Sequence, residues 1–367
     1  MTPGVPLLDP LPLPAPAWLL SALLALTFTL HVVPMNLLLG GSLIAAIARY
    51  RGRRDQHAAA LAGLIAKALP VVFAATVTLG VAALLFLQAL YGRVFFPGAV
   101  LLAVPWILIV PLIIVAYYGA YWQATGAVAH GPGPRASGSG AWLVALPVLG
   151  VAFIQANTMG LLLRPLEFAA MFFAGASGLR LNLGDPTLAP RFLHVVIGAL
   201  AVSGVAIAIG GLVLRQRDPE RGAWMVRHGA LVAAGATIVN ILPGLWWLVV
   251  LPSETILLFM GRDLAATMWL VVGVVSARAV LGHLIPAARG RDPRRFLAGG
   301  AASLLVCMVS MVEVRDIVRR ASLGPSTMPS AEWVTPQWGA IAAFGALLVG
   351  AILTVAWMVR SLVRARA

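Results

Sequence analysis

The sequence predicts an all-α polytopic membrane protein. Hydrophobic residues make up 61% of its 367 residues and charged residues only 10%, whereas soluble domains carry about 25% charged residues. Apolar stretches of about 20 residues or more, the length that a helix needs to cross the bilayer, recur along the whole chain. Because these stretches lack the alternation of a membrane strand, helices rather than a barrel must satisfy the backbone in lipid.

The apolar stretches predict nine membrane spans, and no soluble domain fits between them. Residues 1–367 are therefore expected to form a single transmembrane domain. The segment before the first span contains no Lys or Arg, and a cleavable signal peptide requires such a basic region. We therefore expect the first span to be retained. In chain order, the predicted spans are 17–48, 62–91, 98–124, 141–164, 191–214, 227–251, 263–285, 296–318 and 336–360.

The basic residues between the spans predict the orientation of the chain. With the N-terminus outside and the C-terminus inside, 18 of the 26 Lys and Arg residues lie on the cytoplasmic side, as the positive-inside rule requires. We expect the protein in the bacterial cytoplasmic (inner) membrane. Although the net charge is +14, its spread over loops argues against a nucleic-acid partner. The inner residues are Arg49, Arg51, Arg53, Arg54, Lys67, Arg135, Arg215, Arg217, Arg221, Arg227, Arg278, Arg289, Arg291, Arg294, Arg295, Arg360, Arg364 and Arg366.

The tetrapeptide Leu-His-Val-Val occurs twice, around His31 and around His194. Each copy lies near the outer start of a span that ends in arginines. This match predicts two parallel four-helix repeat units, residues 17–164 and 191–318, with 336–360 as an extra helix. Internal repeats of membrane proteins often place a binding site at their interface.

Four side chains that can bind iron or move protons are predicted at the same depth, in the outer leaflet. At about 1.5 Å per residue, His31 lies about 27 Å from the inner boundary that Arg49 marks, and Glu313 lies about 26 Å from it. His194 and Met268 each follow closely after the outer start of their spans. We therefore expect His31, His194, Met268 and Glu313 to lie in one layer.

Glu313 is the only one of the twelve acidic residues that lies well inside a predicted span. A carboxylate in lipid costs several kcal/mol and usually faces a bundle interior, where it acts. The structural alternative for Glu313 is an ion pair with Arg315 or Arg319. For each histidine, the structural alternative is a hydrogen bond between helices.

This combination of side chains suits haem. Imidazole and thioether groups are axial ligands of low-spin haem iron, whereas a single His or carboxylate leaves an open position, as in high-spin haem. Helical bundles build such sites from inward-facing side chains. Haem b is the expected cofactor, and a second haem in the inner leaflet with His283 as its ligand is an alternative. The outer arginines available to the haem propionates are Arg93, Arg164, Arg180, Arg191, Arg315 and Arg319.

The order of these residues resembles a known family. His in span one, His in span five ("PRFLHVVIGALAVSG"), Met in span seven ("DLAATMWLVVG") and Glu followed by Arg in span eight ("MVSMVEVRDIVR") resemble the haem-bearing subunit I of cytochrome bd quinol oxidases. The resemblance implies nine spans in the predicted orientation. It also implies that His194 and Met268 bind one low-spin haem b, and that His31 and Glu313 bind two further, high-spin haems.

The sequence departs from that family in three places. The long quinol-binding loop between spans six and seven is replaced by "PSETILLFMGR". The family's Gly-Arg-Gln-Pro-Trp signature and its span-three carboxylates are absent. Because those carboxylates belong to the family's proton path, we expect electron transfer rather than rapid oxygen reduction.

The sequence thus predicts a membrane-embedded b-type cytochrome that transfers electrons between the quinone pool and an outer-side redox protein such as a c-type cytochrome. Other membrane subunits are expected as partners. Two alternatives stay open. One is a bd-type quinol:oxygen oxidoreductase, and the other is a proton-coupled secondary transporter in which Glu313 and the histidines form the site.

Overall fold

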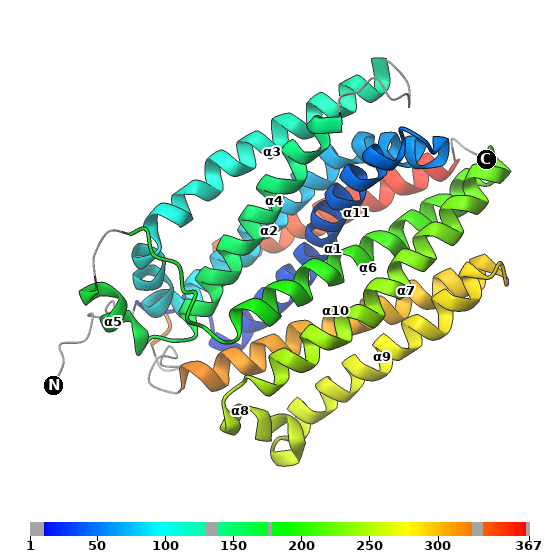
Figure 1. Cartoon of the computed structure of the whole chain (residues 1–367). Helices are drawn as coiled ribbons and strands as arrows, with labels where there is room; N and C mark the ends of the chain where they lie inside the picture. Colours follow the sequence, from blue (N-terminus) through cyan, green and yellow to red (C-terminus); the bar gives the residue numbers. More distant parts are fainter. Residues whose placement is uncertain (1–10, 130–137, 175–177, 325–332, 365–367) are drawn as a thin grey trace.

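Long helices run side by side along most of the chain, as its hydropathy predicts (Figure 1). The computed structural model describes residues 11–129, 138–174, 178–324 and 333–364, so Arg135 and Arg366 lie outside the described residues. Within them, eight helices are long and apolar enough to cross a membrane, which confirms the predicted fold class. These are α1 (Ala17–Arg51), α2 (Gln56–Leu101), α3 (Ala103–Ala129), α4 (Gly138–Leu162), α6 (Leu188–Leu214), α7 (Pro219–Val249), α9 (Leu264–Ala288) and α10 (Pro293–Leu323).

The helices form two sets of four with the same pattern of neighbours. In the first set, α1 packs against α2 and α4, and α3 packs against α2 and α4. In the second set, α6 packs against α7 and α10, and α9 packs against α7 and α10. The helices α1 and α6 also pack against each other and join the two sets. The predicted repeat units, residues 17–164 and 191–318, stay a prediction.

The contact between α1 and α6 depends on small residues. A Cβ atom on Gly40 of α1 would lie 2.1 Å from the carbonyl oxygen of Ala199 and 2.6 Å from Oγ of Ser203, both on α6. The Ser203 hydroxyl donates a hydrogen bond of 3.1 Å to the carbonyl of Asn36. Close approach at small residues, with polar groups bonded across the interface, is typical of helix pairs in membranes.

Acidic residues at the span edges start several helices. Asp218 and Asp292 accept hydrogen bonds from backbone N–H groups in the first turns of α7 and α10, and each is followed by a proline at the first helical position. Asp55 and Asp263 accept backbone N–H groups in the same way at α2 and α9. Such caps satisfy donors that a helix start otherwise leaves unpaired. Capping therefore explains these acids without a catalytic role.

The boundary between the second and third predicted spans was wrong. We expected a break at 92–97, but α2 continues to Leu101, with a kink at Tyr91 (φ −124°), and α3 begins at Ala103. The side chains of Val94 and Phe95 are buried in an apolar cluster with Leu20 and Phe168. Tertiary packing thus holds this segment as a helix although Pro97 lies within it.

Short helices cover the outer end of the bundle. The helix α5 (Glu167–Phe173) follows α4, and α8 (Ser253–Leu257) continues into a π-helical turn, η1 (Leu258–Arg262), before α9. The predicted loop between spans six and seven is therefore mostly helical. It packs through Phe259, which is 2% exposed, against Val314 and Val318 of α10. Gly261 has φ of 105°, a conformation that favours glycine.

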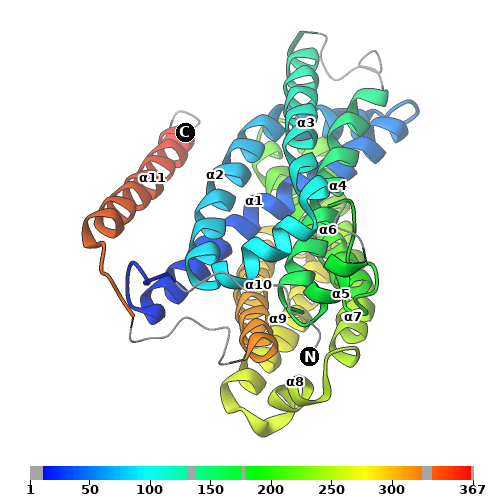
Figure 2. The same ribbon diagram turned by 90° about the vertical axis from the view of Figure 1, so that its left-hand side faces the viewer.

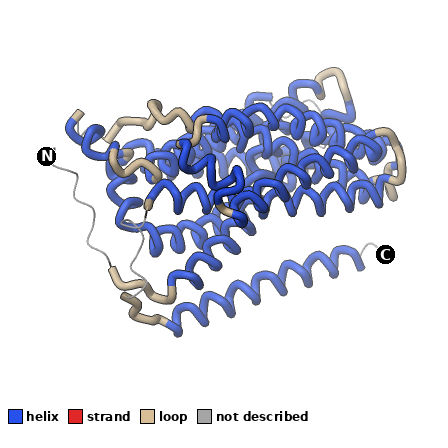
Figure 3. Tube along the Cα trace, turned by 90° about the horizontal axis from the view of Figure 1, so that it is seen from below, coloured by secondary structure: helices blue, strands red, loops and turns tan. Residues whose placement is uncertain are grey.

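The last helix, α11 (Trp338–Arg364), lies apart from the other long helices (Figures 2 and 3). It is 27 residues long, but its described apolar part, Trp338–Thr354, is not among the eight candidate membrane spans, so the ninth span stays a prediction. Its Phe344 ring packs edge-on against Phe86 of α2, with ring centroids 5.0 Å apart. The segment before it is held by two backbone hydrogen bonds of 2.9 Å, from Thr335 N–H to the Leu13 carbonyl and from Leu13 N–H to the Trp333 carbonyl.

Candidate functional site

The His31 ring is fixed against the neighbouring helix α2. Its Nδ1 atom lies 3.0 Å from the carbonyl oxygen of Thr76. The ring lies over Gly80, where an added Cβ would come within 2.8 Å of its Cε1 atom. In an α-helix the carbonyl of residue 76 points toward residue 80, so a side chain at position 80 would block this hydrogen bond. The absence of a Cβ on Gly80 therefore gives His31 access to the Thr76 carbonyl.

His194 occupies an equivalent place between α6 and α7. Its ring lies over Gly244, where a Cβ would come within 3.1 Å of Cε1 and 3.2 Å of Nδ1. The backbone of Asn240, four residues before Gly244, lies beside the ring. The His194 Nδ1 atom is buried, and its geometry falls short of a hydrogen bond. The two histidines thus share one arrangement, in which only the first has its hydrogen bond formed.

Both histidines lie on the outer side of the contact between α1 and α6. His31 precedes Gly40 by nine residues, and His194 precedes Ser203 by nine. Gly40 and Ser203 are in contact where α1 and α6 meet. Gly40 also contacts Ala199, five residues after His194. Because both helices run in the same direction, His31 lies about 13 Å and His194 about 8–13 Å from this contact on its outer side. Both histidines therefore lie in the outer half of the bundle, and their place in one layer of iron-binding residues stays a prediction.

Neither glycine was among the predicted site residues. Gly80 and Gly244 lie 164 residues apart, and the two histidines lie 163 apart. Because the two offsets differ by one residue, a search at the exact offset of the histidines pairs Gly80 with Pro243 and misses Gly244. A third ring, that of His283 on α9, lies over Gly299 of α10 in the inner half, but its Nδ1 bonds the Ala279 carbonyl of its own helix at 2.7 Å.

Arg315 differs from the other outer arginines in its partners. Its guanidinium lies 4.3 Å from the centroid of the Phe28 ring on α1, and that ring lies 6.2 Å from the His31 ring. No carboxylate lies within ion-pair distance of Arg315 in the described part of the chain. The positive charge of Arg315 therefore lies close to His31 and, among the described residues, forms no ion pair.

Arg191, the other predicted cofactor-binding arginine, has protein partners. It lies 3.4 Å from a carboxylate oxygen of Asp185 and also donates to the Thr187 hydroxyl. Arg164 pairs with Glu167 at 3.1 Å, and Arg319 pairs with Asp316 at 2.8 Å. Two further arginines were predicted to be available to the haem propionates. Arg180 donates a hydrogen bond to the Ala174 carbonyl, and Arg93 also has an interaction partner.

Glu313 does not form the ion pair that was its structural alternative. Arg315 contacts Phe28 instead, and Arg319 is bound to Asp316. Glu313 is partly buried on α10 and forms no hydrogen bond or ion pair in the described part of the chain. A carboxylate within a membrane helix thus lacks a protein partner.

Met268 lies on the outward face of α9. Its side chain is 53% exposed, whereas Ala266 and Gly273, on the opposite face, are buried. No hydrogen bond or ring contact joins Met268 to His194. The structure therefore brings His31 and Arg315 into one neighbourhood and places His194 in the outer half of the bundle as well, while Met268 faces away from the packed helices.

Most of the buried polar atoms without hydrogen-bond partners lie in the outer half of the bundle, and His194 is among the residues that carry them. Within the described residues, seven buried side-chain atoms lack a hydrogen bond, and only those of His57 and Arg221 lie at the inner end. An unsatisfied buried polar group costs about 1–3 kcal/mol, and natural structures usually supply a partner, water or a ligand. The outer atoms belong to Asn157, Asn182, His194, Asn240 and Trp247.

No protein-family model matches the chain, and no curated protein matches it either. Among solved structures, the chain is similar to a chain of the bd oxidase from Geobacillus thermodenitrificans. The likeness has a TM-score of 0.73 at 14% sequence identity, and it covers 94% of this chain and 97% of that chain. At this identity the likeness concerns the fold. The chain is therefore a multi-pass membrane protein with a bd-oxidase-like fold.

Proposed function

We propose that this chain is a membrane-embedded b-type cytochrome, a divergent relative of bd oxidase subunit I, that transfers electrons between the quinone pool and an outer-side redox protein such as a c-type cytochrome. The observation that carries the proposal is the pair of histidines in the outer half of the bundle, each lying over a glycine and beside a backbone carbonyl of the next helix. The bd-oxidase-like fold supports a respiratory role for such a pair.

The donor set fits haem b. Histidines that bind metals usually donate their second ring N–H to a carbonyl or carboxylate, which fixes the ring and leaves the other nitrogen for the metal. The Thr76 carbonyl is such a partner for Nδ1 of His31, which leaves Nε2 for iron. Bound haem supplies reversible one-electron transfer. His194 and Glu313 would be the further ligands in this proposal, whereas Met268, whose side chain is 53% exposed, stays a prediction of the family resemblance.

Arg315 is the favoured partner for a haem propionate. Arg315 lies over the Phe28 ring, which lies 6.2 Å from the His31 ring, and it forms no ion pair in the described chain. A carboxylate bound there would form a charge-assisted hydrogen bond in a setting of low dielectric constant. Arg191 contributes less, because Asp185 already balances its charge.

Electron transfer is tested with the purified chain in nanodiscs. Reduction of the bound haem by a short-chain quinol, followed by reoxidation by a soluble c-type cytochrome, is the expected result. Reduction without reoxidation by that cytochrome, together with rapid oxygen uptake, would instead establish the bd-type quinol:oxygen oxidoreductase. The bd-oxidase-like fold favours this second function.

A protein without visible absorbance would contradict both cytochrome functions. The proton-coupled transporter would then remain, and proton-driven solute uptake into proteoliposomes would be its direct measurement.

A further inference from the structure

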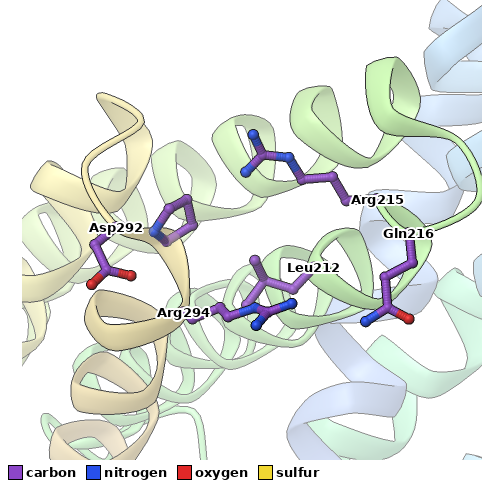
Figure 4. Close-up of a pocket in the computed structure, with 6 residues that line it drawn as sticks. Leu212, Arg215, Gln216, Asp292 and Arg294 are labelled. Atoms are coloured by element: carbon purple, nitrogen blue, oxygen red, sulfur yellow. The ribbon is translucent and has the colours of Figure 1, made fainter. Parts of the chain in front are cut away.

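A cleft opens between the inner ends of α6 and α10, away from His31 and His194 (Figure 4). Its volume is about 280 Å³. One wall is the last turn of α6 and the residues that follow it, and the other is the first turn of α10. The lining residues are Leu212, Arg215, Gln216, Asp292, Pro293 and Arg294.

The cleft carries a net positive charge. Arg215 and Arg294 line it from opposite walls, and neither forms an ion pair in the described chain. The one acid in the lining, Asp292, is engaged as the cap of α10, since its Oδ1 accepts the N–H of Arg295 at 3.3 Å. The start of α10 adds the positive end of a helix dipole. An anionic group between the two arginines would therefore be attracted from three directions.

The two helix faces that lead from the cleft into the membrane are apolar. On α6, Ile209 and Leu212 precede Gln216 at helical spacing, and the Ile209 side chain is 40% exposed. On α10, Leu305 lies three turns after Arg294 on the same face and is 50% exposed. A ligand that combines an anionic head with hydrocarbon tails matches both parts of this surface.

We propose that the cleft between α6 and α10 binds the phosphate headgroup of an anionic phospholipid from the inner leaflet, with the phosphate between Arg215 and Arg294. Arginine is suited to phosphate oxygens because its fork of donors matches their geometry. Basic pockets between membrane helices on the cytoplasmic side are a recurring way of binding such headgroups. This site is independent of the cytochrome function, because it lies at the opposite end of the helices from His31 and His194.

The test measures binding of phosphatidylglycerol to the delipidated chain in detergent, by native mass spectrometry and by thermal protection. The variant R215Q/R294Q should bind about tenfold more weakly, because each basic residue near an anionic lipid contributes substantially to binding. The matched control R217Q/R291Q removes two arginines from the same helix ends that do not line the cleft, and it should bind like the unmodified chain. Phosphatidylcholine and phosphatidylethanolamine should bind more weakly than phosphatidylglycerol.

A second variant keeps the test decisive if R215Q/R294Q folds poorly. In Asp292→Asn the cap is retained, because Asn is an equally good N-cap, but the only acid of the lining is removed. Tighter binding of phosphatidylglycerol is expected, and misfolding cannot produce such a gain. The proposal would be overturned if R215Q/R294Q bound phosphatidylglycerol as well as the unmodified chain does, or if R217Q/R291Q lost as much binding as R215Q/R294Q. It would also be overturned if the zwitterionic lipids bound as well as phosphatidylglycerol. Equal protection by millimolar inorganic phosphate would assign the cleft to a soluble anion instead.

Discussion

The two histidine sites have the same backbone arrangement but differ in how completely their polar groups are paired. At the first site, His31 Nδ1 has the Thr76 carbonyl as its partner at 3.0 Å. At the second site, His194 Nδ1 is buried without a hydrogen bond beside the backbone of Asn240. The first ring is therefore already oriented by the protein, whereas the second requires a small rotation, or a bound group, to satisfy its nitrogen.

The arginine near the second histidine forms an ion pair, whereas the arginine near the first histidine does not. Arg191 lies one turn before His194 and corresponds in the predicted repeat to Phe28, one turn before His31. Arg191 is neutralised by Asp185, whereas Arg315, which lies over Phe28, has no acid partner in the described chain. An oriented imidazole and an arginine without an ion pair in the described chain therefore coincide at the first site only. We therefore propose that the first site holds its cofactor more tightly.

Removal of the histidines should have the largest effect. His31→Ala and His194→Ala should each lose the absorbance of one haem, because a helical bundle offers no replacement ligand at either position. The haem content per chain and the reduced spectrum measure the loss. If the two sites are distinct, the two variants should lose different spectral components. Identical spectra for both variants, or full haem retention in either, would contradict the assignment.

Substitution of Gly80 and Gly244 by alanine should destabilise the protein to different extents, because the two glycines approach their histidine rings at different distances. Gly80→Ala places a Cβ 2.8 Å from the His31 ring, closer than the 3.1 Å at Gly244. We expect a loss of about 1–3 kcal/mol in the free energy of unfolding for Gly80→Ala, as for other overpacked cores, and a smaller loss for Gly244→Ala. Denaturant titration in detergent measures both.

Gly235→Ala is the matched control for the glycine pair, because nothing lies within 4 Å of a Cβ at that position of α7. It should be neutral or slightly stabilising, since Ala favours helix more than Gly. A control as unstable as Gly80→Ala would show that the effect arises from the helix backbone and not from the histidine.

Replacement of Glu313 tests whether its carboxylate serves the first site. Glu313→Gln should remove or alter one haem signal without unfolding the chain, because Glu313 has no protein partner in the described residues. The control Asp316→Asn disrupts the ion pairs with Arg319 and Arg320, so it should affect stability instead. Complete haem retention in Glu313→Gln would remove Glu313 from the site.

The smallest effect is expected from Met268→Leu. Because the Met268 side chain is half-exposed, its loss should leave the stability unchanged. The reduction potential of the low-spin haem should fall, or its iron should become high-spin, since a thioether ligand raises the potential. A redox titration followed by absorbance measures this change, and an unaltered potential and spectrum would exclude Met268 as a ligand.

The positions of the helices and of the histidines could be predicted from the sequence because they depend on local properties. Hydropathy gives the long helices, and a count of residues along parallel helices places His31 and His194 in the outer half of the bundle. The continuation of α2 beyond Tyr91 could not be predicted, because it depends on burial of Val94 and Phe95 by residues distant in the sequence.

The partners of the polar groups were also beyond sequence reasoning. Six outer arginines looked equivalent along the chain, and only the packing of α10 against α1 distinguishes Arg315 from the others. Likewise, the roles of Gly80 and Gly244 depend on the distance between two helices. Pairing and close approach are properties of the assembled bundle.

We propose above all that this bd-oxidase-like fold carries haem b in its outer layer. A pyridine haemochrome spectrum of the purified, reduced chain measures this directly, because it identifies the haem type and counts it against protein. We expect non-covalently bound haem b, with more than one haem per chain. A colourless chain, purified under conditions in which other membrane cytochromes retain their haem, would contradict it.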